Sequence, residues 1–323
     1  MAVTSDTPVP TTEGWVRAHA LTTKHVVFDV EGNPQPVKGV QLYIPAECYE
    51  ASFHDGVAVR GDRHMSFELQ DKTWRDRRGS WAKNRGKKGA RKSMRRPLKK
   101  KSVHELSRES LAREDGRREY SLPVASPVKY SWVDLPVPPY VVGVFLATLS
   151  PTGRHWLREK HDIKRMRARS REHGYSIVTR KHKNGDTLME FRPPLATSFS
   201  VYGEGAPDSV PFSYMSASPE QREQLLDGFL DGYGSKKDLV EIVEHSWGRI
   251  RKLQGLVESL GYRSRLLKHE TRGYFTLEFY KNREKPSNLY RFLSKINKIT
   301  PKQCAHVLTE RPFLVEEGFL AVC

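Results

Sequence analysis

The chain has 323 residues, a formal net charge of +17 and an isoelectric point of about 9.7. This length allows about two domains with sizeable cores, and the positive charge favours a polyanionic partner. It has no apolar run long enough for a transmembrane helix, and its N-terminus lacks the features of a signal peptide. The three cysteines, Cys48, Cys304 and Cys323, are too scattered for a disulfide framework or a zinc site. We therefore expect a cytoplasmic protein without membrane association.

The first seventy residues are predicted to be rich in strands. Strand-like runs cover residues 26–30, 39–44, 48–53 and 57–60, and turn signals at 31–34 and 54–56 separate them. Asp55-Gly56 between alternating runs is a strong hairpin signal. The sequence here predicts a compact all-β module.

Two segments of this module carry a family resemblance. Residues 4–15 are similar to the block that follows the first residue of an intein, and residues 48–64 to the second intein block, which ends in a histidine. The segment thus resembles the N-terminal half of the Hint protein-splicing fold. The resemblance implies that His64 polarises the upstream scissile peptide bond. Family members usually have threonine three residues before this histidine, where this chain has Gly61.

The nucleophile position departs from the family. The first residue of an intein is normally Cys or Ser, because an acyl shift needs a nucleophile there. Ala2 stands at that position and has no reactive atom, so the usual first step is blocked. One hypothesis is an engineered substitution that prevents cleavage. The alternative is a natural intein that starts from an internal cysteine; that class also has tryptophan two residues past the block histidine, where this chain has Ser66.

Residues 72–101 form the most basic segment, with 15 Lys or Arg and one acidic residue, Asp76. Its glycines disfavour a helix, and its tryptophans are interleaved with the charges. We predict a mobile arm that neutralises DNA phosphates; the alternative is a solvated loop without a partner. The arm residues expected to contact DNA are Lys83, Arg85, Lys87, Lys88, Arg91, Lys92, Arg95 and Arg96.

Two helices with bare glycine faces are predicted in the middle of the chain, after a proline-punctuated connector at 120–130. In the helix at 139–150, Gly143 and Ala147 are four residues apart. In the helix that follows Ser218, Gly228 and Gly232 repeat that spacing. Ser218 as N-cap, proline at the first helical position and glutamine at the capping-box spacing indicate where the second helix begins. Small residues at this spacing allow two helices to approach closely.

Residues 141–149 and 226–234 resemble the two motifs of a single-chain LAGLIDADG homing endonuclease. The resemblance implies a domain of two similar halves and an acidic residue at the eighth position of each motif, where it holds the metal for DNA cleavage. Those positions are Thr148 and Tyr233, which are poor ligands for Mg²⁺. Asp231 lies two residues before Tyr233, does not face the same way on a helix, and is expected to be structural. We therefore predict that nuclease chemistry is lost or severely weakened.

The segments after each motif helix are predicted to supply strands for a DNA-binding surface. In the first half we expect a basic helix over 154–173 and a hairpin with its turn at 184–185. In the second half we expect a helix from 237 to 261, followed by strands at 263–269 and 274–279. Alternation within these strands selects DNA-contacting candidates: Arg180, Lys181, Lys183, Arg263, Arg265 and Lys268.

The tail alternates as a hairpin over residues 313–322, with its turn at 317–318, and resembles the last two intein blocks. Cys304 falls where the family has an aspartate or cysteine near both scissile bonds. The family ends in asparagine, whose cyclisation cuts the downstream bond, and no such residue stands here. Cys323 is then either the penultimate intein residue or the first downstream residue.

These predictions combine into an α+β chain of two domains. An all-β Hint module comprises residues 1–112, with the basic insertion 72–101, and 293–323; a pseudo-twofold αββαββα LAGLIDADG domain is inserted at 119–292. The expected function is a self-splicing element with a homing endonuclease, blocked in both reactions but able to bind double-stranded DNA. It would be a monomer whose natural partners include flanking host-protein segments (exteins). Splicing needs no cofactor, and Mg²⁺ is needed only if the nuclease is active.

Two alternatives remain open at this stage. The same double-motif scaffold occurs in sequence-specific DNA-binding proteins and RNA maturases, which have no need of intein-like ends. The chain could also be an active Mg²⁺-dependent endonuclease that uses other carboxylates.

Overall fold

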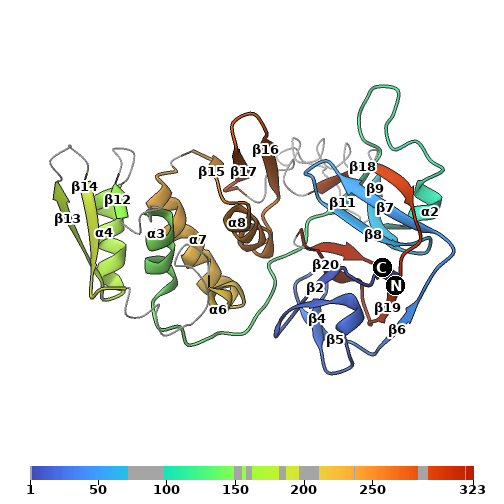
Figure 1. Ribbon diagram of the computed structural model, residues 1–323, viewed down its shortest axis with the longest axis horizontal. Helices are drawn as coiled ribbons and strands as arrows, with labels where there is room; N and C mark the ends of the chain where they lie inside the picture. The colour runs from blue at the N-terminus through green and yellow to red at the C-terminus, as the bar shows by residue number, and fades with distance from the viewer. Residues whose placement is uncertain are drawn as a thin grey trace, which may run out of the picture. The chain divides into compact units, whose positions relative to one another are not determined.

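The computed structural model describes residues 2–71, 98–148, 155–157, 162–181, 187–195, 211–235, 237–282, 290–316 and 318–323. The chain divides into two compact units. The terminal unit comprises Met1–Val128, Gly261–Arg265 and Asn282–Cys323, and the central unit comprises Lys129–Leu260 and Leu266–Lys281. Both ends of the chain therefore belong to the terminal unit (Figure 1). None of the described helices has the length and apolar character needed to cross a membrane.

The terminal unit is built mainly from strands. Before the central unit these are β1 (Ala2–Thr4), β2 (Pro8–Thr11), β3 (Gly14–Arg17), β4 (Val26–Phe28), β5 (Pro34–Pro36), β6 (Gly39–Tyr43), β7 (Cys48–Phe53), β8 (Ala58–Asp62), β9 (Ser66–Asp71), β10 (Lys99–Ser102) and β11 (Tyr120–Pro123). The short helices η1 (Ala18–Ala20) and α2 (Val103–Leu106) interrupt them. After the central unit come β18 (Tyr290–Ile299), β19 (Cys304–Leu308), β20 (Phe313–Val315) and β21 (Leu320–Val322).

Within the described residues, nine strands form one sheet in the order β10-β9-β11-β18-β7-β8-β1-β19-β6. The first strand of the chain lies inside this sheet, because β1 pairs with both β8 and β19. The predicted hairpin around Asp55-Gly56 is confirmed as β7–β8, with Gly56 at a φ of +90°. The predicted tail hairpin is confirmed as β20–β21.

The strand alternation separates two faces around β1. Val3, Val59 and Ala305 belong to the large apolar core of the unit. Their neighbours Ala2 and Cys304 pack instead with Cys48 in a small second cluster. Since successive side chains of a strand point to opposite faces, this second face carries the residues nearest the start of the chain.

Two segments differ from the sequence-based predictions. Tyr120–Pro123 was predicted to be a connector, but it forms β11 between β9 and β18 and therefore packs in the terminal unit. Lys99–Ser102 includes the end of the predicted mobile arm, yet it pairs with β9 as β10. Backbone pairing with neighbouring strands outweighs local composition in both segments. The arm residues from Lys83 to Arg96 lie outside the described residues.

The middle of the chain contains two segments of similar element order, which belong to the central unit apart from Ser264 and Arg265. The first is α3 (Pro139–Thr148), β12 (His155–Leu157), α4 (Ile163–Glu172), β13 (Ser176–Lys181) and β14 (Thr187–Arg192). After α6 (Phe212–Met215), the second is α7 (Pro219–Tyr233), β15 (Leu239–Glu244), α8 (Trp247–Ser259), β16 (Ser264–His269) and β17 (Tyr274–Tyr280). The described strands of the segments have equivalent orders, β12-β14-β13 and β15-β17-β16. This is an internal repeat.

The order within each repeat corrects the predicted αββαββα arrangement, since a strand and a second helix follow each motif helix before the hairpin. Residues 237–246 were predicted to begin a helix, but 239–244 form β15, in which Val240 and Ile242 are buried and Glu241 is exposed. This period of two and the β-branched residues favour a strand. The predicted helix over 154–173 likewise begins only at Ile163, after strand β12.

The two glycine-faced helices α3 and α7 pack directly against each other, as their sequences predict. A Cβ on Gly143 would lie 2.1 Å from the carbonyl oxygen of Leu225, and one on Gly228 would lie 2.0 Å from that of Tyr140. The α7 capping box is also confirmed: the Ser218 hydroxyl accepts from the Gln221 amide, and the Gln221 side chain accepts from the Ser218 amide. The absence of side chains at the two glycines is what allows the backbones to touch.

Candidate functional site

His64 stands on a tight turn between β8 and β9. The turn is held by the buried carboxylate of Asp62, whose Oδ1 accepts hydrogen bonds from the backbone amides of His64 and Met65, both at 2.9 Å. An aspartate that bonds to amides two and three residues ahead fixes a turn through its own side chain. Meanwhile Oδ2 of Asp62 accepts from the Tyr43 hydroxyl at 2.5 Å. The local sequence thus presents the exposed His64 ring at the end of two strands.

Gly61, three residues before His64, has a steric explanation. It pairs with Val3 of β1, and a Cβ at this position would lie 2.4 Å from the carbonyl oxygen of Ala2. Threonine, the residue expected from the resemblance, would require β1 or β8 to shift. The close approach of β1 therefore excludes a hydroxyl side chain here.

Ala2 lies opposite His306 in the β1–β19 pairing. Sequence reasoning missed His306, although it lies two residues beyond Cys304 and therefore on the same face of its strand. Burial lowers the pKa of the His306 imidazole below its ordinary value. A neutral imidazole at neutral pH can accept a proton beside the backbone of Ala2.

Cys304 lies in the small cluster with Ala2 and Cys48, and its Sγ is 3.9 Å from that of Cys48. Both thiols are fully buried and point toward the carbonyl oxygen of Lys302, at 3.6 and 3.7 Å. Burial raises the pKa of the Cys304 thiol well above its ordinary value. The resting group is a neutral thiol, and it needs a base before it can act as a nucleophile.

Cys323 is held against β9 by a residue close to His64. The Ser66 hydroxyl and amide both donate to the Cys323 carbonyl oxygen, at 2.7 and 3.2 Å, and the Cys323 amide donates to the Ser66 carbonyl at 2.8 Å. Ser66 stands where the internal-cysteine class would have tryptophan. Its role here is to fix the last residue of the sequence.

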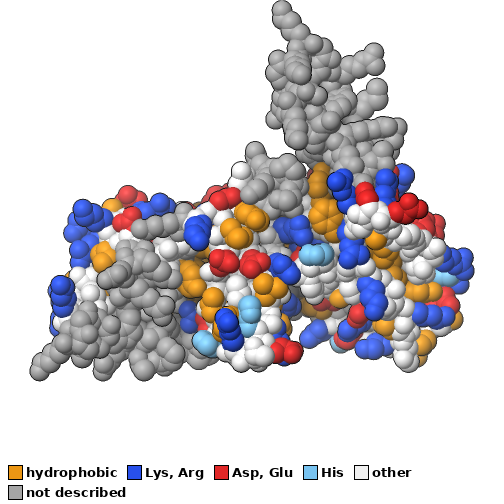
Figure 2. Space-filling model, turned by 90° about the horizontal axis from the view of Figure 1, so that it is seen from above, with side chains coloured by type: hydrophobic (Ala, Val, Ile, Leu, Met, Phe, Trp, Pro, Cys, Tyr) orange, Lys and Arg blue, Asp and Glu red, His pale blue; other side chains and the backbone are white. Residues whose placement is uncertain are grey.

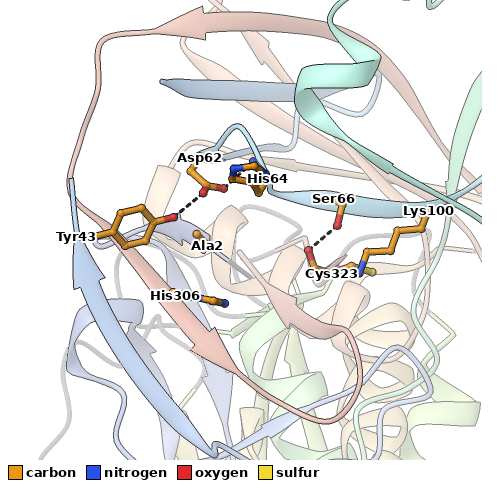
Figure 3. Close-up of a pocket in the computed structure, with 8 residues that line it drawn as sticks. All are labelled: Ala2, Tyr43, Asp62, His64, Ser66, Lys100, His306 and Cys323. Carbon is orange, nitrogen blue, oxygen red and sulfur yellow. Dashed lines mark hydrogen bonds between the residues drawn. The ribbon is translucent and has the colours of Figure 1, made fainter. Parts of the chain in front are cut away.

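Several of these residues surround a cavity of about 350 Å³ (Figure 3). Figure 3 shows His64 beside Asp62 and the Lys100 side chain extending toward Cys323. The cavity thus brings together Ala2, His64 and Cys323, which the sequence singled out, with Tyr43, Asp62 and His306, which it did not. It is lined by Ala2, Tyr43, Asp62, His64, Ser66, Lys100, His306 and Cys323.

The two predicted nuclease positions carry hydroxyl groups with local partners. The Thr148 hydroxyl donates to the carbonyl of Val144 in its own helix at 2.8 Å. The Tyr233 oxygen accepts from the amide of Val243 at 2.9 Å. Asp231 accepts from Tyr140 and Arg165, both at 2.9 Å, so its contacts are those of a structural carboxylate. No group of three or more His, Cys, Asp or Glu side chains within the described ranges is arranged to hold a metal ion.

The predicted DNA-contacting residues of the strands have mixed surroundings. Arg180 lies 3.4 Å from Glu190, and Lys268 lies 3.5 Å from Glu270. Arg263 precedes β16 and stacks on the ring of Phe292 at 5.5 Å. Lys181 and Arg265 are exposed, whereas Lys183 is outside the described residues. On the face in Figure 2, Lys and Arg side chains are spread among acidic and apolar ones.

No protein-family model matches the chain, and no curated protein matches it. Among solved structures it is similar to the MchDnaB-1 intein, at 23% identity over 21% of this chain and 53% of that one, with a TM-score of 0.20. It is also similar to the Msm DnaB1 intein splicing domain bound with zinc, at 25% identity over 21% of this chain and 55% of that one, with a TM-score of 0.20. The similarity to the gp41-1 intein has 12% identity over 38% of this chain and 76% of that one, with a TM-score of 0.24. The chain spans about half the length of the first two, and TM-scores this low do not establish a shared fold.

Proposed function

We propose that the terminal unit is an intein-type splicing module whose ordinary first step is blocked. The single observation that carries this proposal is the common cavity of Ala2, His64 and Cys323. Splicing requires that the two junctions meet at one set of catalytic groups. Residues 2 and 323 are remote in sequence, and their position in one cavity is what such chemistry needs.

The cavity residues and Cys304, which packs against Ala2 outside the cavity lining, have distinct roles in this proposal. His64 polarises the peptide bond before Ala2, and Ala2 supplies no nucleophile for an acyl shift onto itself. Cys304 is the thiol packed against Ala2, so it is the candidate for an internal-cysteine route. In that route the Cys304 sulfur bonds to the carbonyl carbon of the peptide bond before Ala2, and the bond from this carbon to the Ala2 nitrogen breaks. The thiol proton passes through the neutral imidazole of His306 to the leaving amine of Ala2.

A restored nucleophile tests the module. The full chain with Ala2→Cys and a tagged segment upstream should form a thioester, so that hydroxylamine or dithiothreitol releases the tag. The same chain with His64→Ala added is the control and should release it about a hundredfold more slowly, the scale of a lost general acid or base. Mass spectrometry gives the cleavage site. An Ala2→Cys chain that releases no tag contradicts the proposed function.

The internal-cysteine route is tested without changing Ala2. If Cys304 is the nucleophile, the tagged parent chain should release its tag with hydroxylamine, and Cys304→Ala should abolish that release. Cys48→Ala is the matched control, because the two thiols share the same buried surroundings. Equal release of the tag from Cys304→Ala and Cys48→Ala rejects Cys304 as the nucleophile. If the parent chain releases no tag, the internal-cysteine route is rejected and the first step is blocked, as the absence of a nucleophile at Ala2 predicts.

A second function concerns the central unit, which we propose to be a LAGLIDADG-type DNA-binding scaffold without an efficient nuclease centre. The internal repeat and the contact of α3 with α7 through Gly143 and Gly228 support it. Plasmid cleavage with Mg²⁺ should be absent in the parent, and strong cutting contradicts this proposal. Restoration of cutting by Thr148→Asp with Tyr233→Asp would support these positions as its degenerate acid sites.

DNA binding is tested separately from cleavage. Affinity should fall with salt, and deletion of residues 72–101 should reduce the log–log slope by about one unit for each phosphate that these residues neutralise. An unchanged slope contradicts the arm. Preference for a single duplex sequence favours a DNA-binding element, whereas preference for structured RNA would support the maturase alternative.

A further inference from the structure

The buried carboxylate of Asp62 links two strands that flank the cavity. Asp62 ends β8 and is 3% exposed, while Tyr43 ends β6, at the edge of the nine described strands of the sheet. The Tyr43 hydroxyl donates to Oδ2 of Asp62, and the other carboxylate oxygen accepts the amides of His64 and Met65. One carboxylate therefore receives three hydrogen bonds. Among the described residues, no Lys or Arg nitrogen lies within ion-pair distance of it.

The place of this pair in the sheet distinguishes it from other tyrosine hydrogen bonds. A buried carboxylate without a cation needs hydrogen bonds to offset its desolvation, and Asp62 accepts three. Elsewhere in the sheet, the hydroxyl of Tyr49 bonds to His104 at 3.1 Å and to Glu47 at 3.4 Å, and none of these three residues lines the cavity. Tyr43 and Asp62 both line it. Among the described residues, Asp62 is the only one whose side chain hydrogen-bonds to the backbone of the His64 turn.

We propose that Tyr43 and Asp62 are positioning residues for His64. The Tyr43 hydroxyl fixes the orientation of the Asp62 carboxylate, and that carboxylate fixes the backbone from which the His64 ring reaches the peptide bond before Ala2. This role rests on the proposed splicing function. It also accounts for Gly61: since the approach of Ala2 excludes threonine there, the orienting groups come from Asp62, the next residue, and from Tyr43 of β6, which β1 and β19 separate from β8 in the sheet.

Three variants would change these hydrogen bonds in different ways. Tyr43→Phe removes one hydrogen bond and keeps the ring. Asp62→Ala removes all three side-chain hydrogen bonds and leaves the turn with the backbone bond from the Met65 amide to the carbonyl of residue 62, at 3.1 Å. Asp62→Asn keeps an oxygen that can accept the amides of His64 and Met65, while its NH₂ group can donate to the Tyr43 oxygen. A positioning role therefore predicts that asparagine restores what alanine removes.

Two measurements test the proposal. In the otherwise unchanged chain, amide exchange at His64, whose amide bonds to the Asp62 side chain, should accelerate in Asp62→Ala and remain slow in Asp62→Asn. In the Ala2→Cys chain with its upstream tag, release should slow about a hundredfold for Asp62→Ala, the scale of a misplaced catalytic group. Release should slow severalfold for Tyr43→Phe and stay within severalfold of the parent for Asp62→Asn.

The controls are Tyr49→Phe and Asp71→Asn, which make the same chemical changes in β7 and β9 away from the cavity, and both should release the tag at the parental rate. If the Ala2→Cys parent releases no tag, the proposed function itself fails. If the parent releases the tag and both Tyr43→Phe and Asp62→Ala match its rate, the positioning role alone is overturned. Faster exchange in Asp62→Ala without slower release also overturns it.

Discussion

A Cβ placed on Gly143 would lie 2.1 Å from the carbonyl oxygen of Leu225 and 2.6 Å from the amide nitrogen of Phe229. The backbone of α7 therefore occupies the volume that any side chain at Gly143 would need. The obstructing atoms are backbone, so a rotamer change cannot relieve the overlap. The two helices can approach this closely because Gly143 in α3 and Gly228 and Gly232 in α7 have no Cβ.

Gly143→Ala should destabilise the central unit by about 1–3 kcal/mol, the usual cost of overpacking. Urea unfolding followed by amide exchange in α3 and α7 measures the change in the free energy of unfolding. Gly248→Ala in α8 is the control: no heavy atom outside its immediate neighbours lies within 4 Å of the added Cβ. Its better helix propensity should leave stability unchanged or raise it by up to about 1 kcal/mol. Equal stability of the two variants contradicts the close packing.

The ion pair of Asp55 and Arg291 should be essential to the terminal unit. Their atoms lie 3.0 Å apart, and the side chains are 0% and 3% exposed. Asp55→Ala leaves the guanidinium buried without its carboxylate, which should cost about 3–5 kcal/mol in the free energy of unfolding. The exposed pair of Lys38 and Glu310, at 3.8 Å, supplies the control. Glu310→Ala should change stability by less than about 1 kcal/mol, and a similarly small change in Asp55→Ala would contradict the prediction.

Local signals in the sequence were sufficient for several elements. The capping box of Ser218 and Gln221, the glycine spacing of α3 and α7 and the hairpin at Asp55-Gly56 each depend on residues a few positions apart. Residues 239–244 were interpreted wrongly as helix, because apolar residues in a short run fit either period. The alternation and β-branched residues of 239–244 favour a strand, and pairing with β17 establishes it.

The cavity could be predicted only in part. Ala2, His64 and Cys323 were singled out through family resemblance, and Cys304 lies beside Ala2 in the small cluster. Tyr43, Asp62 and His306 were missed because their proximity depends on the pairing of β6 and β1 with β19, which is remote from both in sequence. The spacing from Cys304 to His306 was the available signal for one of them. Nothing local to Tyr43 identifies its carboxylate partner.

Gln221→Glu should weaken the attachment of residues 129–138 to α7. The Gln221 amide donates to the Val133 carbonyl at 2.6 Å and accepts from the Val133 amide at 3.1 Å. Glutamate cannot donate, so its carboxylate would face a carbonyl oxygen in a buried site, at a cost of about 1–3 kcal/mol. Faster amide exchange at Val133 is the expected result. Gln303→Glu, at an exposed position, is the control and should not alter exchange at Val133.

The thiol of Cys323 should be protected by its protonation state as well as by burial. Burial raises its pKa from about 9 to about 11. Because a thiol is neutral when protonated, the folded chain retains a proton that the unfolded chain releases over this interval. The contribution of this group to stability is therefore complete below pH 9 and decreases as the pH rises toward 11.

Iodoacetamide reacts with the thiolate form of cysteine, and the thiolate fraction at pH 8 is about a hundredfold smaller at the raised pKa than at the ordinary one. Mass spectrometry should show alkylation of Cys323 at least that much slower in the folded chain than in urea, with the difference narrowing as the pH approaches 11. Equal alkylation rates of Cys323 at pH 8 in the folded chain and in urea would contradict both its burial and its raised pKa.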